Sequence, residues 1–298
     1  MNDSNAPFPR TAEERFLAAL AHLSALTLGV GLALPMVLWS EYRRKSRYLA
    51  FQSLQALGYQ TLGYTLWFLV YLLAFVVLFV GIIALAALFP AVDEDTLGLG
   101  IALFLLAAVF IPLGGYLFVP VVAAIACALG RDFRYPFMGR LEAYLNGEAG
   151  DGWFDAERED RWVAAMGHFS VIIALWGLVV PVLAFFTQRK RSAFLRFQSL
   201  QTLIYQAIGT VGVLGGAIVL SVGGFVFGLL AAVNPFLDSV IVIIAALLFL
   251  IVLMLFLLLV PFYHILGQWA GLRTLQGRNY RYPLVGRLAA RWANPKED

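Results

Sequence analysis

The stretch FQSLQALGYQ at residues 51–60 returns as FQSLQTLIYQ at residues 197–206, with eight of ten letters identical. Each copy follows a run of Arg and Lys and opens a long apolar segment. Two further blocks repeat in the same order: EERFLAALAHLS as EDRWVAAMGHFS, and GRDFRYPFMGR as GRNYRYPLVGR. Ordered blocks at a nearly constant spacing of 146 or 147 positions predict a tandem duplication.

The repeats divide the chain into five parts. We expect an N-terminal tail at 1–10, a first membrane unit at 11–145, an acidic linker at 146–156, a second membrane unit at 157–292 and a C-terminal tail at 293–298. Acidic residues and glycines crowd the segment LNGEAGDGWFDAERED that joins the units. Such a composition is typical of a solvated linker.

The composition places the chain in a bilayer. Of its 298 residues 61% are hydrophobic and only 13% are charged, whereas a soluble domain is about 25% charged. Uncharged stretches run over 48–92, 97–130, 162–188, 197–237 and 239–272. Each exceeds the roughly 20 residues that a helix needs to cross a membrane, and the apolar runs do not alternate as barrel strands do. The sequence therefore predicts an all-α, polytopic helical membrane protein.

Each unit contains three apolar segments, at 16–39, 48–89 and 97–128 and then at 162–186, 193–231 and 236–273. If all six crossed fully, the second unit would be inverted and the basic loops would lie on both faces. If the first segment of each unit enters and returns, there are four full spans plus two re-entrant or half-spanning segments. Every basic loop then faces the cytoplasm, as short Lys- and Arg-rich loops prefer.

The acidic loops AVDEDT (91–96) and NPFLDS (234–239) would then lie on the opposite face. Two glycines and a proline in TLGVGLALP (27–35) offer a place for a helix to break, provided that neighbouring helices cover it. We prefer this parallel arrangement. The alternative of six full spans stays open, because inverted repeats build many transporters.

The repeated stretch carries neutral polar residues on one helix face. Gln52, Gln55 and Tyr59 share a face by helical spacing, and Gln198, Gln201 and Tyr205 do the same. His22 and His168 occupy one repeat position. These side chains either join helices by hydrogen bonds or line a polar groove for a peptide or a lipid headgroup.

Basic residues gather beside the apolar segments: Arg43, Arg44, Lys45, Arg47, Arg134, Arg140, Arg189, Lys190, Arg191, Arg196, Arg281 and Arg287. Each cation near an anionic leaflet contributes about 1 kcal/mol of attraction. We expect these residues to orient the chain and to dock anionic lipid or a partner. Nucleic acid is not an expected partner, since no soluble domain presents the charges.

The sequence shows no sign of catalytic chemistry. It contains no zinc pattern, P-loop, dinucleotide fingerprint or nucleophile elbow. A single cysteine allows no internal disulfide, and ionisable residues are scarce within the apolar segments, which argues against ion coupling. We expect no catalytic residue, no metal and no cofactor.

Together, the AHLS start, the proline-containing first segment, the basic loop, the glutamine stretch and the closing RYP resemble one known group. They are similar to the bacterial relatives of the membrane subunit of the chloroplast inner-envelope protein translocon. RFQSLQTLIYQ (196–206) carries the nearest similarity, and Ala50 stands in the first copy where Arg196 stands in the second. The plastid member is implicated in preprotein translocation. The resemblance implies four spans with basic loops on the inner side.

We therefore predict a non-enzymatic, multi-pass protein of the bacterial inner membrane with cytoplasmic basic loops. Its expected role is an accessory or structural subunit that docks partners within a larger membrane complex. A translocon-like or transporter-like conduit for peptide or lipid is the alternative. The expected partners are membrane lipids and a membrane protein, or a second copy of the chain.

Overall fold

The computed structural model describes residues 10–88, 93–147, 152–233 and 240–293, and every regular element in these ranges is helical. The first unit contains α1 (Ala12–Leu23), the 3-10 segment η1 (Ser24–Leu32), α2 (Ala33–Tyr42), α3 (Arg47–Leu88), α4 (Glu94–Ala128), η2 (Pro136–Met138) and α5 (Leu141–Asn146). The second contains α6 (Ala156–Phe169), η3 (Ser170–Leu178), α7 (Val179–Gln188), α8 (Ala193–Val233), α9 (Val240–Leu275) and α10 (Val285–Ala293). The repeated order confirms the tandem duplication. Three expected parts of the chain lie outside the described residues, wholly or in part. These are the two tails (except Arg10 and Ala293), the start of the AVDEDT loop, and all of the NPFLDS loop.

The first apolar segment of each unit is a hairpin rather than one straight helix. The chain reverses at the equivalent residues Leu28 and Ala174, whose φ angles are 55° and 44°. The hydroxyl of Tyr42, at the end of α2, donates to Glu13 Oε1, at the start of α1, at 3.1 Å. Both ends of this hairpin therefore lie together, at the same end of the molecule.

Local sequence determines where the hairpins begin. Thr11 and Glu14 form a capping box at the start of α1, in which each side chain bonds the backbone N–H of the other residue. Asp155 accepts from the N–H groups of Glu157 and Arg158 at the start of α6. These bonds satisfy N–H groups that a helix start otherwise leaves without a partner.

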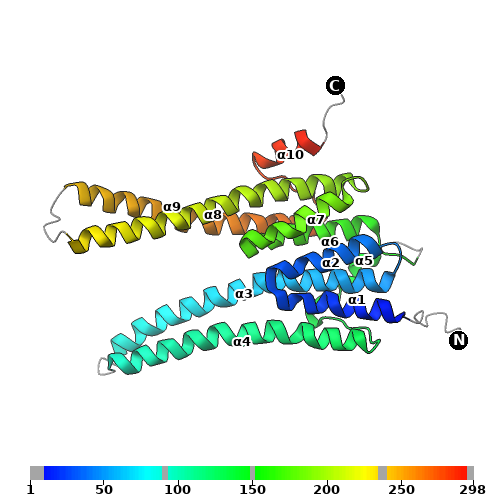
Figure 1. The fold of residues 1–298 in the computed structure, drawn as a ribbon, viewed down its shortest axis with the longest axis horizontal. Helices are drawn as coiled ribbons and strands as arrows, with labels where there is room; N and C mark the ends of the chain where they lie inside the picture. The colour runs from blue at the N-terminus through cyan, green and yellow to red at the C-terminus, as the bar shows by residue number, and fades with distance from the viewer. Residues whose placement is uncertain (1–9, 89–92, 148–151, 234–239, 294–298) are drawn as a thin grey trace.

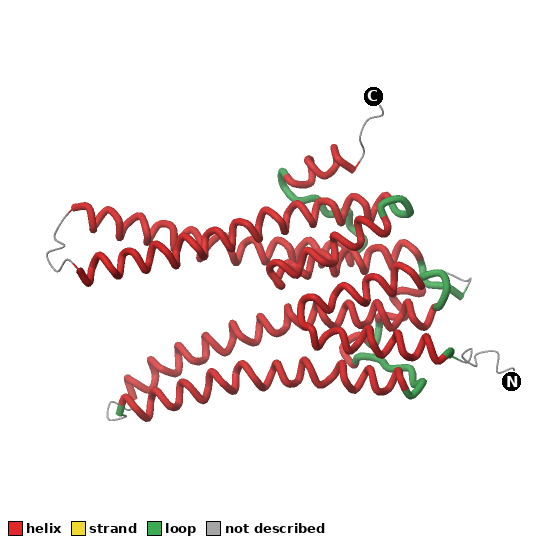
Figure 2. Tube along the Cα trace, viewed as in Figure 1, coloured by secondary structure: helices red, strands yellow, loops and turns green. Residues whose placement is uncertain are grey.

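The long helices project beyond the hairpins in pairs, α3 with α4 and α8 with α9 (Figure 2). With 42 and 41 residues, α3 and α8 are each about 60 Å long, roughly twice the hydrocarbon thickness of a bilayer. Large apolar side chains are exposed along the projecting parts, from Leu66 to Leu88 in α3 and from Ile208 to Leu229 in α8. A bilayer is the solvent that suits such surfaces, so the chain is a multi-pass membrane protein.

All basic turns lie at one end of the molecule. The α2–α3 and α7–α8 turns and the start of α1 lie there, whereas the last turns of α3 and α8 and the first turns of α4 and α9 lie at the opposite end (Figure 1). Six stretches are long and apolar enough to cross a membrane. Two of them, 12–42 and 156–188, are the hairpins that return. The preferred prediction of four full-length helices and two returning segments is therefore the arrangement observed.

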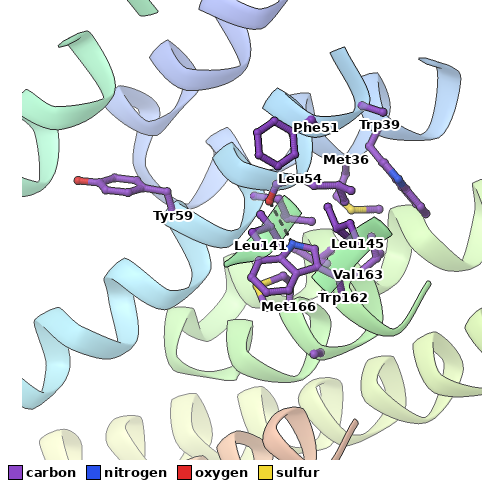
Figure 3. Close-up of a cluster of buried hydrophobic side chains, with 14 of the residues drawn as sticks. Met36, Trp39, Phe51, Leu54, Tyr59, Leu141, Leu145, Trp162, Val163 and Met166 are labelled. Atoms are coloured by element: carbon purple, nitrogen blue, oxygen red, sulfur yellow. Dashed lines mark hydrogen bonds between the residues drawn. The ribbon is translucent and has the colours of Figure 1, made fainter. Parts of the chain in front are cut away.

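The two units share one core. Trp162 of α6 lies among side chains of both units, and its indole N–H donates to the Leu54 carbonyl oxygen at 3.1 Å (Figure 3). Met36 and Trp39 of α2 and Leu145 of α5 join the same cluster. The first unit contributes mainly α2 and α3 to this contact, and the second contributes α6, η3 and α7.

The segment between the units is less solvated than its composition predicts. Phe154 is buried in the shared core, and Glu159 and Asp160 are buried as well. The expectation of a solvated acidic run is therefore wrong for these residues. The cause is pairing, since arginines of the first unit approach the two carboxylates.

Candidate functional site

The repeated glutamine stretch of the first unit belongs to a buried hydrogen-bonded cluster, here called the first latch: His22, Gln52, Gln55, Tyr59 and Tyr135. His22 Nε2 lies 2.9 Å from Gln52 Oε1, and His22 Nδ1 lies 2.9 Å from the Tyr135 hydroxyl. The Tyr135 N–H donates to Gln55 Oε1 at 3.2 Å. The ring of Tyr59 stacks on that of Tyr135 with 4.3 Å between centroids. The first latch thus ties the loop after α4 to α1 and α3.

The second unit repeats this geometry in the second latch: His168, Gln198, Gln201, Tyr205 and Tyr282. His168 lies 3.1 Å from Gln198 Oε1 and 3.0 Å from the Tyr282 hydroxyl. The Tyr282 N–H donates to Gln201 Oε1 at 3.2 Å, and the Tyr205 and Tyr282 rings stack at 3.9 Å. Two copies of one arrangement tie two closing RYP loops to two hairpins.

The glutamines use their hydrogen-bonding groups within the latches. Gln52 Nε2 donates to Asp132 Oδ1 at 3.0 Å and to the Phe133 carbonyl oxygen at 3.2 Å, and Gln55 Nε2 donates to the same carbonyl at 3.0 Å. His22 and all four latch glutamines are completely buried. The latches therefore place polar groups between packed elements rather than along an open path.

Burial also keeps the loop tyrosines neutral. Loss of solvent raises the pKa of the Tyr135 and Tyr282 hydroxyls well above the ordinary value for tyrosine. A neutral hydroxyl can both donate and accept, which suits a position beside an imidazole nitrogen. The latches therefore hold their hydrogen bonds without introducing charge.

A second polar region, here called the seam, joins the two units at their basic end. Arg43 Nη2 lies 3.1 Å from Glu159 Oε2 and 2.9 Å from Asp160 Oδ1, and Arg44 Nη2 lies 3.2 Å from Glu159 Oε2. The Trp39 indole N–H donates to Glu159 Oε1 at 3.1 Å. Glu159 is fully buried, and these donors offset part of what its carboxylate loses when it gives up its water.

The basic residues singled out in the sequence have different surroundings. Arg43 is buried in the seam, and Arg47 bonds Asn146 Oδ1 at 2.6 Å and lies over the Phe154 ring. Lys45 pairs with Glu41, and Arg134 pairs with Asp132 and Glu142. Arg196 is partly buried. Arg44, Lys45 and Arg134 are exposed but take part in ion pairs. The other exposed members are Arg140, Arg189, Lys190, Arg191, Arg281 and Arg287, so docking to lipid or partner stays a prediction for these.

Sequence reasoning missed the seam and one clamp in each hairpin. Gln60 Nε2 donates to Ser24 Oγ at 3.0 Å, and Gln206 Nε2 donates to the Gly167 carbonyl oxygen at 2.7 Å. The available signal was the last glutamine of the repeated stretch, which is identical in both copies. Among the described residues, no three His, Cys, Asp or Glu side chains gather as a metal site.

Comparison with known proteins identifies one family. Residues 13–142 and 159–289 each match the MamF/MmsF family, described as a magnetosome magnetite crystal formation protein family. No curated protein and no solved structure matches the chain. A relation to the chloroplast translocon subunit is not among these findings and stays a prediction from the motifs. Because the two matches cover nearly all of both units, the chain belongs to the MamF/MmsF family of magnetosome magnetite crystal formation proteins, as two fused copies.

Proposed function

We propose that the chain is a structural subunit of the membrane that surrounds a growing magnetite crystal. It holds two membrane-spanning hairpins at a fixed separation and presents a basic end to partner proteins, with no catalytic step of its own. One observation carries this proposal: the repeated histidines and glutamines are completely buried and bonded within the two latches.

The same observation disfavours a conduit for peptide or lipid. A polar path needs side chains that are free to contact the solute or water. Gln52 instead accepts from Gln55 and donates to Asp132 and Phe133, so little hydrogen-bonding capacity remains for a solute. Internal bonds of this kind stabilise helix packing, by about 0.6–2 kcal/mol each in membranes.

The proposed orientation places the basic end in the cytoplasm. Short loops rich in Lys and Arg favour that side, and all of the basic turns lie at one end of the molecule. We infer that the membrane is the bacterial inner membrane or one derived from it. Arg140 and Arg281, which close the two units and are exposed, are the proposed contact points for acidic partners.

The test uses a magnetite-forming bacterium whose own member of this family is deleted. The tagged chain is expected to enter the magnetosome membrane and to restore crystal size in electron micrographs. The double variant Arg140→Glu, Arg281→Glu should reach the membrane but fail to restore crystal size. The matched variant Arg131→Glu, Arg278→Glu changes exposed arginines of the same two loops and should restore it.

Reconstituted vesicles test the alternative. Purified chain in liposomes should release an entrapped dye or peptide, and should scramble labelled lipid, no faster than vesicles without protein. A clear protein-dependent flux, or a chain that never enters the magnetosome membrane, would contradict the structural role.

A further inference from the structure

The seam is one-sided. On the first unit the contact uses a receiving face on α2 and α3, made by Trp39, Arg43, Leu54 and Gly58. On the second unit it uses an inserting face on α6, made by Glu159, Asp160 and Trp162. Within the described residues α3 packs on α6, whereas the equivalent pair α8 and α1 makes no comparable contact. Apart from the α2–α7 and η1–η3 contacts, in which each element is the equivalent of the other, the contacts between the units are therefore not related by a two-fold exchange.

Because only one receiving face and one inserting face meet in the seam, the second unit keeps a receiving face, and the first unit keeps an inserting face, that do not contact each other. The second unit carries its own receiving face at the equivalent positions Phe185, Arg189, Leu200 and Ile204. The first unit carries its own inserting face on α1 at Glu13, Glu14 and Phe16. Phe16 is 61% exposed, whereas its equivalent Trp162 is 8% exposed in the seam.

Helix α10 covers the receiving face of the second unit. Ala289 and Ala293 are buried against Leu200, and Phe185 and Ile204 pack at the edge of the same cluster. The equivalent helix of the first unit, α5, packs against α6 instead, because α6 occupies the receiving face there. Helix α10 therefore takes the place on unit two that α6 takes on unit one.

We propose that α10 is a displaceable cover over a docking face, and that this face accepts α1 of a second copy of the chain. The charges of the seam are repeated at the free faces. Arg189 and Lys190 stand where Arg43 and Arg44 stand, and Glu13 and Glu14 stand where Glu159 and Asp160 stand. Each copy would thus offer the other the same pairing of arginine or lysine with carboxylate.

The substitutions at the free faces favour a reversible contact. Phe185 and Phe16 replace Trp39 and Trp162, so both indole hydrogen bonds of the seam are lost. The smaller ring of Phe16 would face the larger side chain of Ile204, where the seam sets Trp162 against Gly58. A contact weaker than the internal seam can compete with α10 only when α10 is released.

Among the described elements, helix α10 packs mainly on one neighbour, α8. Its buried positions are the small residues Gly286, Ala289 and Ala293, while Arg291 and Trp292 point away and are exposed. Small side chains bury little apolar area, and burial is worth roughly 25 cal/mol per Å². Release of α10 would therefore disturb mainly its contact with α8 and no other major helix contact.

Head-to-tail contact of this kind builds a ring if the rotation closes and a row of copies if it does not. The inference rests on the proposed structural role and gives it one partner, the chain itself. It uses α1, the end of α7, α8 and α10. Arg140 lies outside these elements, and Arg281 lies over the Phe197 ring at the edge of the α10 contact.

The test is crosslinking between two differently tagged copies in the membrane, one with Glu13→Cys and the other with Arg189→Cys. Adding Ala289→Arg to both copies places a long charged side chain in the α8–α10 contact and should raise the 13–189 product about tenfold, the change that roughly 1.4 kcal/mol produces. Truncation after Pro283 should do the same while keeping Tyr282 of the second latch. Arg291→Ala, on the exposed side of α10, is the matched control and should leave the yield unchanged.

Charge reversal identifies the contact. For this test the crosslinking cysteines are Phe16→Cys and Ile204→Cys, which keep Glu13 and Lys190, the equivalents of the paired Glu159 and Arg44. In the Ala289→Arg background, Glu13→Lys on the first copy should reduce the 16–204 product, and Lys190→Glu on the second should restore it. The proposal is overturned if both released variants stay folded by thermal unfolding yet give no more product than the parent chain. It is also overturned if the 13–13 pair crosslinks as well as the 13–189 pair. The crosslinking yield is measured independently of the crystal size that tests Arg140 and Arg281. A failure of this proposal can therefore be told from a failure of the proposed structural role.

Discussion

Glu13 and Glu159 occupy equivalent positions in the two units, yet their surroundings are opposite. Glu13 is exposed and meets the Tyr42 hydroxyl, whereas Glu159 is completely buried among Trp39 and two arginines. The duplication therefore supplies its own control, because the same side chain stands once in water and once in a protein interior.

Replacing Glu159 by Ala removes one of the two carboxylates that pair with the buried Arg43, and it leaves the Trp39 indole N–H without its acceptor. Removal of one partner of a buried ion pair costs about 3–5 kcal/mol. Because Asp160 stays beside Arg43, the free energy of unfolding in detergent should fall by the lower end of that range, about 3 kcal/mol. Glu13→Ala changes an exposed position and should stay within about 0.5 kcal/mol of the parent. Equal effects of the two substitutions would show that the seam does not stabilise the fold.

The latches give a second prediction for single residues. Gln52→Leu deprives His22 Nε2 of its partner, while the Phe133 carbonyl oxygen keeps the bond from Gln55. An unsatisfied buried polar group costs about 1–3 kcal/mol. Gln198→Leu should cost a similar amount, while Gln276→Leu, at an exposed position, should not lower the thermal midpoint. A neutral Gln52→Leu would rule out the latch as a stabilising contact.

At the scale of elements, the two hairpins depend on close backbone approach. A Cβ atom at Gly31 would lie 1.9 Å from the Ser24 carbonyl oxygen, and one at Gly177 would lie 2.2 Å from the Ser170 carbonyl oxygen. Glycine is thus required because the backbones of the two arms of each hairpin pass too close together for a side chain. The reversal itself occurs at Leu28 and Ala174, which have positive φ although they are not glycine.

Substitution of these glycines should loosen the hairpins. Gly31→Ala forces backbone apart, and strain of this kind costs about 1–3 kcal/mol, seen as a lower thermal midpoint and faster trypsin cleavage near α1. Gly81→Ala in α3 has nothing within 4 Å and serves as the control. It should be neutral or raise stability by up to about 1 kcal/mol, since alanine favours helix. Equal loss at both positions would refute the close-approach explanation.

The sequence predicted much of the element scale. Apolar run lengths gave the long helices, and the choice of a returning first segment followed from keeping every basic loop on one side. The glutamine and histidine positions were found by repetition, and their bonding partners were not. The partners Asp132, Phe133 and Tyr135 lie about 80 positions or more from the glutamines and His22, and only packing brings them together.

The seam escaped prediction for a different physical reason. Arg43 and Glu159 meet, while their equivalents Arg189 and Glu13 do not. Because the two units have similar sequences at these positions, the sequence does not show which unit buries them in the seam. That choice depends on how one whole unit packs against the other.

At the scale of the whole molecule, the fold predicts which positions share a compartment. Cysteines replacing Lys45 and Lys190 should react with an impermeant maleimide from one side of the membrane, and a cysteine replacing Thr96 only from the other. All three positions are exposed. If the cysteines at positions 45 and 190 react from opposite sides, the units are inverted and the parallel arrangement is wrong.

The returning hairpins also bear on how such a protein could arise. Because each unit starts and finishes at the same membrane face, its gene can be copied in frame and joined by a few codons. The second product then inserts with the orientation of the first, and no compensating segment is needed. A unit with an odd number of crossings would have turned its duplicate upside down.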